Sequence, residues 1–250
     1  MGKLSLTTVI HRRRRVPVVA SLVSTLLTTP ALAQVGHDPA RSPYRDIPRG
    51  HSVTVLGGYI GGGGGRFGIA PHSGSGFGLR YDIRTSSAVQ VGIGVARAEL
   101  ERRIVDPFVV LAERDQGIVP QTVTVAEFDL QLNLTGGKTW HRLAPFVGSA
   151  AGVTFPSGTP ADTSGFEFGR KFYVAPHAGV RAFITSRLHL RGEVRAMFWK
   201  LKYPPSFEAE PPDEPGDPPS NSNAVIQDGR VSEWTATSWL QVGLGYSFSL

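Results

Sequence analysis

Hydrophobic and polar positions alternate through the final segment of the chain, from Trp234 to Leu250. Every second residue from Trp234 onward belongs to an increasingly apolar set, whereas the intervening residues are mostly threonine, serine, glycine and glutamine. Successive side chains of a β-strand point to opposite faces. The segment therefore predicts a long strand with one apolar face and one polar face.

Seven earlier segments show the same period of two. The clearest is 121–135, where Phe128 and Leu130 lie on one face and Glu127 and Asp129 lie on the other. The other expected strands are 51–61, 76–84, 89–96, 143–155, 171–184 and 188–203. The links after the second, fourth and sixth strands are short, and the links after the first, third, fifth and seventh are long. In the second long link, the apolar run 104–112 is expected to extend the neighbouring strands.

Short turns at one end and long loops at the other are typical of a transmembrane β-barrel. An even number of strands also lets an antiparallel sheet close without unpaired edges. We therefore predict an all-β protein, an eight-stranded antiparallel up-and-down transmembrane β-barrel with apolar faces outward and polar faces inward. The alternative is a soluble lipocalin-like barrel, in which the apolar faces would point inward.

The first part of the chain reads as a targeting segment. Residues 1–33 combine the basic run Arg12 to Arg15, the apolar run Val16 to Leu27 and a small-residue site, which predicts a signal peptide cleaved after Ala33. Residues 34–50 are expected to form an extended periplasmic lead-in, and 51–250 the barrel domain. Within that domain, the segment 204–230 is rich in proline, serine, asparagine and acids and is expected to be a disordered loop.

The targeting segment also explains the charge of the chain. It holds five of the 26 lysines and arginines and none of the 20 acids, which leaves 21 basic against 20 acidic residues. The basic excess therefore gives no reason to expect a nucleic-acid partner. Because the chain has no cysteine, disulfides, thiolate metal sites and a cysteine lipid anchor are excluded. We expect no cofactor and no bound metal.

The last strand resembles the C-terminal strand of bacterial outer-membrane proteins, which carries the signal for the barrel-assembly machinery. The matching residues are Gln241, Gly243, Tyr246, Phe248 and Leu250, although the family usually ends in Phe or Trp. From residue 34 onward, the chain resembles the small eight-stranded outer-membrane barrels of the OmpA-transmembrane and OmpW kind. This resemblance implies a monomeric protein of the Gram-negative cell outer membrane, in contact with its lipid and lipopolysaccharide.

The inward faces would collect ten charged or titratable side chains. These are Arg80, Asp82, Arg84, Glu127, Asp129, His177, Arg181, Arg191, Glu193 and Arg195. An eight-stranded barrel is only wide enough for its own side chains, and unpaired buried charges are costly. We therefore expect bidentate arginine–carboxylate pairs that plug the lumen. A narrow polar conduit or a catalytic cluster would use the same residues.

Other motifs give weaker signals. The tract Gly61 to Gly65 is not followed by a helix, so phosphate binding is not expected. Neighbouring residues His72 and Ser73 have no required geometry for nucleophilic catalysis, and His177 has no metal-ligand spacing around it. The acids between Glu208 and Asp217 are expected to be a solvated loop, not a calcium site. The expected function is structural or surface-interacting and not enzymatic; the alternatives are a narrow channel for small apolar or amphipathic solutes and a lipid-modifying enzyme.

Overall fold

The computed structural model describes residues 42–217 and 221–250. The predicted signal peptide and residues 34–41 of the predicted lead-in lie outside these residues. No helix within the described ranges is long and apolar enough to cross a membrane.

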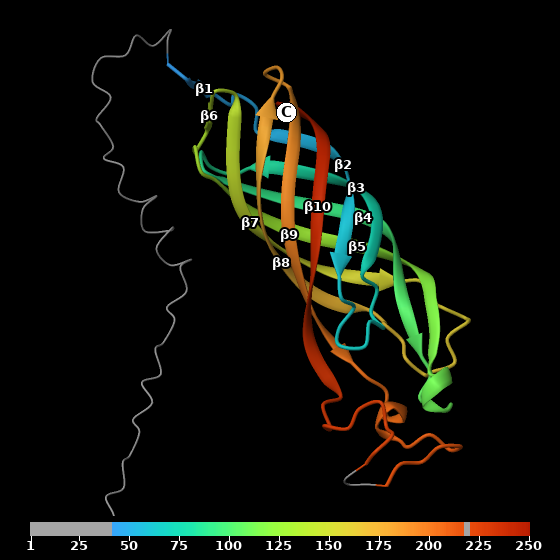
Figure 1. The fold of residues 1–250 in the computed structure, drawn as a ribbon. Helices are drawn as coiled ribbons and strands as arrows, with labels where there is room; N and C mark the ends of the chain where they lie inside the picture. Colours follow the sequence, from blue (N-terminus) through green and yellow to red (C-terminus); the bar gives the residue numbers. More distant parts are fainter. Residues whose placement is uncertain (1–41, 218–220) are drawn as a thin grey trace, which may run out of the picture. The chain divides into compact units, whose positions relative to one another are not determined.

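Eight long strands form a closed antiparallel barrel, as predicted (Figure 1). In chain order they are β2 (His51–Gly62), β3 (Ser73–Arg84), β4 (Val89–Val105), β5 (Asp115–Asn133), β7 (Leu143–Pro156), β8 (Lys171–Phe183), β9 (Leu188–Lys202) and β10 (Ser232–Phe248). Each strand pairs with its neighbour in this order, and β10 pairs with β2. The register from Phe248 opposite His51 to Thr237 opposite Gly62 closes the sheet.

We call the end with the links 85–88, 134–137 and 184–187 the turn end of the barrel. The other end, with the links 63–72, 106–114, 157–170 and 203–231, is the loop end. The strands β4 and β5 reach further toward the loop end than the alternation predicted, because their pairing continues to Val105 opposite Asp115. The first part of the apolar run 104–112 joins β4, whereas the short 3-10 helix Leu111–Glu113 lies in the link.

Two short strands were missed at the turn end. The strand β1 (Tyr44–Asp46) pairs with β6 (Lys138–Trp140), so the end of the predicted lead-in lies against the barrel. The Ile47 amide donates to the Gly137 carbonyl at 2.8 Å, and the Ile47 side chain is buried with Ala144 and Phe183. Strands of three residues are too short to show a period in the sequence.

The segment 204–230, predicted to be a disordered loop, contains local structure in the part that the structure describes. Pro205–Glu208 forms a short 3-10 helix, and the side chain of Phe207 is fully buried. The Phe207 carbonyl accepts a 2.7 Å hydrogen bond from the amide of Ile226, which is also buried. The rings of Phe67 and Tyr203 pack on Phe207. A few buried apolar residues therefore anchor a segment whose average composition is polar.

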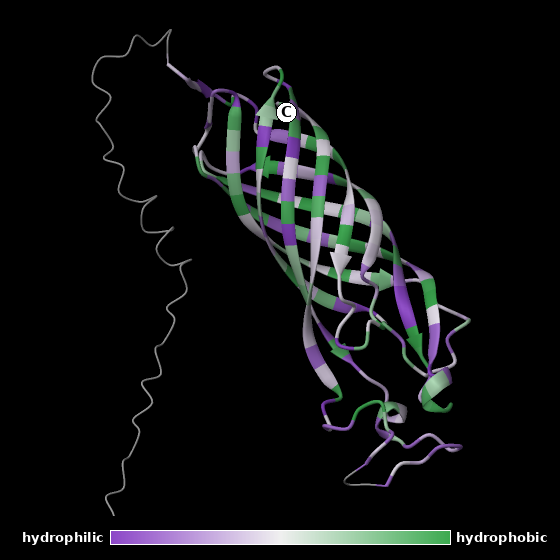
Figure 2. Ribbon diagram, viewed as in Figure 1, coloured by the Kyte–Doolittle hydropathy of each residue, from purple (hydrophilic) through white to green (hydrophobic). Residues whose placement is uncertain are grey.

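The polarity of the two faces follows the prediction in the turn half of the barrel. Leu130 is 52% exposed and Val194 is 53% exposed, whereas the adjacent inward residues Asp129 and Arg195 are buried. Figure 2 shows hydrophobic and hydrophilic positions alternating along the strands. A soluble lipocalin-like barrel would have the opposite arrangement, so that alternative is wrong.

Candidate functional site in the barrel interior

The charged interior comes from alternate positions of four strands. Strand β3 provides Arg80 and Asp82, β5 provides Glu127 and Asp129, β8 provides His177 and Arg181, and β9 provides Arg191, Glu193 and Arg195. Members of this set on the same strand lie two or four positions apart, so all of them project to the same face.

Glycines on the neighbouring strands make room for these large side chains. A Cβ atom built at Gly92 would collide with the Asp82 carboxylate and lie 3.0 Å from Nη2 of Arg80. A Cβ atom at Gly148 would lie 2.5 Å from Nε2 of His177. The absence of side chains at the inward glycines of β4 and β7 therefore leaves room for the charged side chains of β3 and β8.

Arg80 joins two carboxylates from different strands. Its Nε donates to Asp82 Oδ1 at 2.7 Å, and its Nη2 donates to Asp129 Oδ1. All three side chains are 1% exposed. The ring of His177 adds a fourth member, with Nδ1 3.4 Å from Asp129 Oδ2.

A second group is centred on Glu193. Arg191 donates to Oε2 of Glu193 through Nε and Nη2, and Arg195 donates to Oε1. The Nη1 atom of Arg195 also lies 2.6 and 2.7 Å from the two oxygens of Glu127. A cation–π contact places the Arg191 guanidinium 4.1 Å from the centre of the Phe146 ring.

The expected bidentate forks are not formed, and two of the ten residues are not paired with acids. Arg195 uses one nitrogen for both oxygens of Glu127, and Arg191 uses two nitrogens for one oxygen of Glu193. Arg84 donates to the Ile47 carbonyl at 2.5 Å, and Arg181 donates to Asn133 Oδ1 at 2.7 Å. We call the other eight residues the lumen network, which links β3, β5, β8 and β9.

Several neutral partners of the buried charges were not singled out from the sequence. The Tyr173 hydroxyl donates to Glu127 Oε2 at 2.7 Å. Gln131 donates to Asn133 Oδ1 at 2.8 Å, the same oxygen that accepts from Arg181. All three residues occupy inward positions of the alternation, which was the available signal.

The faces exchange their polarity toward the loop end. On β4 the outward residues Ile93 and Val95 are apolar, but the next outward residues, Arg97 and Glu99, are charged and exposed. The inward residues change in the opposite sense, and Leu100 is 2% exposed. The interior at the loop end is therefore an apolar core, whereas a polar lumen was expected along the whole barrel. Its largest members are Trp239, Trp199, Tyr203, Tyr173, Phe166, Phe168, Phe207 and Met197.

A belt of apolar side chains surrounds the charged part of the barrel. It includes Phe77, Leu79, Ile93, Val95, Phe128, Leu130, Leu132, Leu190, Val194, Leu240, Val242 and Leu244, each at least 46% exposed. Only hydrocarbon makes an outer surface of this kind favourable, and in hydrocarbon a closed sheet is required because no backbone group can be left unpaired. The protein is a transmembrane β-barrel. The charged side chains of the lumen network point away from the apolar belt.

No protein family model matches the sequence, and no curated protein matches it. Among solved structures, the chain is similar to Neisserial surface protein A, with 10% identity and a TM-score of 0.46, over 83% of this chain and 98% of that one. It is also similar to the outer-membrane protein OprG of Pseudomonas aeruginosa, with 13% identity and a TM-score of 0.47, over 81% and 98%. The N-terminal β-barrel domain of Pseudomonas aeruginosa OprF gives 10% identity and a TM-score of 0.42, over 79% and 97%.

The remaining sequence motifs do not form a second chemical centre. Nδ1 of His72 lies 2.9 Å from the Ala70 carbonyl, and Ser73 begins β3 opposite Glu101. Within the described residues, no group of three or more histidines or acids could hold a metal ion. The acid Glu210 is held by loop contacts, since its carboxylate accepts from the amides of Gly216 and Asn223, each at 2.9 Å.

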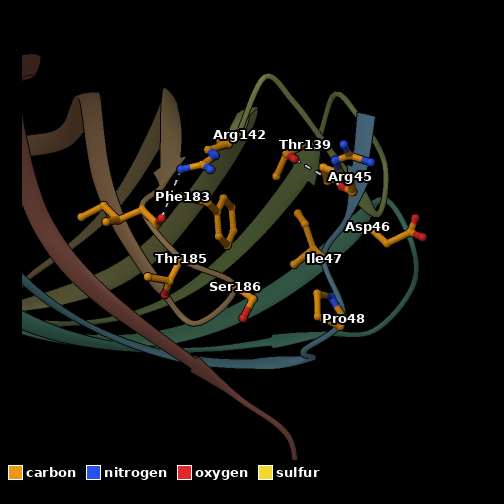
Figure 3. Close-up of a pocket in the computed structure, with 10 residues that line it drawn as sticks. Arg45, Asp46, Ile47, Pro48, Thr139, Arg142, Phe183, Thr185 and Ser186 are labelled. Atoms are coloured by element: carbon orange, nitrogen blue, oxygen red, sulfur yellow. Dashed lines mark hydrogen bonds between the residues drawn. The ribbon is translucent and has the colours of Figure 1, made fainter. Parts of the chain in front are cut away.

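A cavity of about 230 Å³ lies at the turn end (Figure 3). Ile47 and Pro48 form one side, and Phe183, Thr185 and Ser186 form the other. The cavity lies between β1 and the link 184–187, and it contains none of the lumen network residues. It is therefore separate from the charged interior.

Proposed function

We propose that the chain is an integral protein of the bacterial outer membrane, whose barrel is closed to solutes and which acts through its loop end. One observation carries this proposal: the outward apolar belt surrounds an interior filled by paired charges and, further along, by an apolar core. A polypeptide with this surface needs a hydrocarbon environment such as a bilayer, and a filled interior leaves the loops as the accessible part of the molecule.

The burial of the interior side chains supports a closed barrel. The side chains of Arg80, Arg191 and Arg195 are each 1% exposed, whereas arginines that line an open aqueous channel would be wetted. Toward the loop end, Trp199 is 3% exposed and Trp239 is 1% exposed. A solute would have to displace both the lumen network and the apolar core.

The final strand supports the proposed location. Tyr246 lies at the turn end of β10, where its hydroxyl accepts a 3.0 Å hydrogen bond from Arg187. Leu250 is 92% exposed and so is available to a binding partner. We propose that Gln241, Gly243, Tyr246, Phe248 and Leu250 are read by the barrel-assembly machinery, and that lipid and lipopolysaccharide cover the apolar belt.

A narrow channel is the second candidate, because several polar atoms of the interior have no hydrogen-bond partner. These include Nη1 of Arg80, Nη2 of Arg195 and both ring nitrogens of His177. Buried polar atoms of this kind are commonly satisfied by internal water. A connected file of such waters would favour passage of water or of small ions over passage of larger solutes.

Planar-bilayer recording separates the two candidates. The protein is first shown to resist carbonate extraction and to change its gel mobility on heating, as a folded membrane barrel does. We then expect no stepwise conductance from the wild-type chain. The variant Trp239→Ala removes a large side chain from the apolar core, and the matched control Trp234→Ala removes an outward side chain that is 65% exposed. Regular conductance steps from the wild-type protein would contradict the closed barrel and support the channel.

A further inference from the structure

Three exposed basic side chains lie on the outer surface of the barrel at the loop end. Lys200 and Lys202 occupy successive outward positions of β9, and Arg170 directly precedes β8, which pairs with β9. The Arg170 guanidinium lies 5.5 Å from the ring centre of Phe155, an outward residue of β7. Residues two apart on a strand are separated by about 7 Å, and adjacent strands by about 4.8 Å. The three residues are therefore close together, and we call them the basic patch.

The basic patch borders the apolar belt. On β9 the outward positions that precede Lys200 are apolar and include Val194 and Phe198. Trp234 lies opposite Lys200 on β10 and is 65% exposed. Outward aromatic residues at the edge of an apolar belt mark the interface between hydrocarbon and water. The basic patch therefore lies at the level of the lipid headgroups.

The positive charge of the basic patch is not balanced by acids. Its three side chains form no hydrogen bond or ion pair with any described residue. On the outward face of β4, by contrast, Arg97 and Arg103 are accompanied by Glu99 and Glu101. Arg103 also lies 3.6 Å from the carboxylate of Asp115. The charges on β4 therefore offset one another, whereas those of the basic patch add together and favour an anionic partner.

The position and the charge together indicate an anionic lipid. A molecule beside the basic patch has its charged part at the headgroup level and its apolar part against the belt. Arginine binds phosphate through its planar fork and lysine binds it as a point charge. The headgroup of an ordinary phospholipid has a single phosphate. Three adjacent cations are better matched by a lipid that carries several phosphates, as lipopolysaccharide does.

We propose that the basic patch binds the phosphorylated headgroup of lipopolysaccharide, and that its acyl chains pack along the outward apolar residues of β8 and β9. The proposal rests on the proposed function, which places the loop end at the outer leaflet of the outer membrane. It assigns a specific contact to one side of the barrel, in addition to the general contact between lipid and the apolar belt.

Native mass spectrometry of the full chain in detergent micelles tests the proposal, because it counts the lipids that remain bound. The probes are bisphosphorylated lipid A, monophosphorylated lipid A with the same acyl chains, and phosphatidylglycerol. We expect the bisphosphorylated form to bind about fivefold more tightly than the monophosphorylated form, which is the effect of about one charge contact at a membrane surface. Equal binding of the two forms would overturn phosphate recognition. Equal binding of phosphatidylglycerol would overturn lipopolysaccharide as the occupant.

Two double variants localise the binding. Lys200→Gln with Lys202→Gln removes two cations of the basic patch. Arg97→Gln with Arg103→Gln is the matched control, because it removes two exposed outward cations from β4. We expect the first variant to bind bisphosphorylated lipid A about twentyfold more weakly and the control to bind it like the wild type. Unchanged binding in the first variant, or equal weakening in both, would overturn the assignment to the basic patch.

The outcome for the lipid site can be separated from the outcome for the proposed function. The heat-dependent gel mobility of each variant shows that it is folded. A wild-type protein that resists carbonate extraction and does not conduct, but shows no preference for bisphosphorylated lipid A, would overturn the lipid site alone. A protein that carbonate extracts would overturn the proposed function, and the lipid site with it.

Discussion

Glu193 has more charged partners than any other acid of the lumen network. It lies between Arg191 and Arg195, and its side chain is fully buried. Arg195 in turn reaches Glu127, which also accepts from Tyr173. Removing one member therefore leaves several buried groups without their partners, which is more costly than the loss of an exposed ion pair.

We expect Glu193→Gln to destabilise the barrel by about 3 kcal/mol, in the range for breaking a buried ion pair. Its amide cannot neutralise the two arginines that Glu193 now pairs. The measurement is reversible urea unfolding in detergent or lipid. The control is Glu99→Gln, because Glu99 is exposed on the outward face of β4. Equal midpoints for the wild type and Glu193→Gln would show that the network contributes nothing to stability.

The inward glycines make a separate prediction. A methyl group at Gly92 would collide with the Asp82 carboxylate, whereas one at Gly192 meets no atom within 4 Å. We expect Gly92→Ala to lower stability by about 1–3 kcal/mol, as overpacking of a filled interior does. Gly192→Ala, on the outward face of β9, is the control and should leave the unfolding midpoint nearly unchanged. A similar midpoint for both variants would mean that Asp82 and Arg80 move aside at no cost.

All eight members of the lumen network could be predicted from the sequence, but their pairing could not. The period of two places Arg80, Glu127 and Glu193 on inward faces. Which groups meet depends on the stagger between strands, and a sequence does not specify that stagger. Arg181 therefore meets the amide of Asn133, although an acid was expected.

At the scale of elements, the link 203–231 is fixed to the link 63–72 by a charged contact. Arg66 donates through Nη1 to Asp228 Oδ2 at 2.8 Å and through Nη2 to the Arg230 carbonyl at 2.6 Å. The backbone amide of Arg66 donates to Glu233 Oε1 at 2.9 Å, and the same oxygen accepts a hydrogen bond from the Tyr203 hydroxyl. The hydrogen bond from Arg66 is the main reason that the pKa of Asp228 lies below its ordinary value.

This contact predicts a loss of loop order in acid. A carboxyl group whose pKa is lower in the folded state than in the unfolded state stabilises the folded protein. This contribution is fully present above the unfolded-state pKa of about 3.9 and is lost as the pH falls through the folded-state pKa. We expect amide hydrogen exchange of Gly68, corrected for its intrinsic rate, to be constant from pH 7 to about 4 and to increase below. Asp228→Asn should remove this step. A step that persists in the variant would show that Asp228 is not its source.

The long strands were predictable because each shows several repeats of the alternation between apolar and polar residues. The strands β1 and β6 were not, since three residues cannot establish a period. The structure of the described part of the link 203–231 depends on Phe207 and Ile226, two apolar residues in a segment that is polar on average. Their burial results from contacts with residues distant in sequence, such as Phe67, so local composition could not indicate it.

At the scale of the whole molecule, the strand order followed from the alternation of short and long links. The exchange of polarity between the faces could not be predicted from the sequence in this way. An alternation with a period of two shows which residues share a face, but it does not show which face is inside. On β4 the alternation continues unchanged past Val95, while the apolar set moves from the outward to the inward positions. Only the closed sheet shows where this happens.

Labelling of single cysteines tests the boundary that this exchange defines. The chain has no cysteine of its own, so a single introduced thiol reports on one position. In intact proteoliposomes we expect Glu99→Cys to react with a membrane-impermeant maleimide and Ile93→Cys to be protected. Both positions are exposed on the outward face of β4, so they differ only in their distance from the loop end. Equally fast labelling of both would place Ile93 in water and contradict the transmembrane arrangement.

The exchange of polarity on β4 also determines how deeply the barrel can sit in a bilayer. If the barrel moved along its axis so that the loop end entered the bilayer, Arg97 would reach hydrocarbon. The cost would rise from about 1 kcal/mol near the interface to about 2–4 kcal/mol at the midplane. Movement in the opposite direction would expose Ile93 and Val95 to water. Lipids of unequal chain length should therefore stretch or compress around a barrel that keeps the same height.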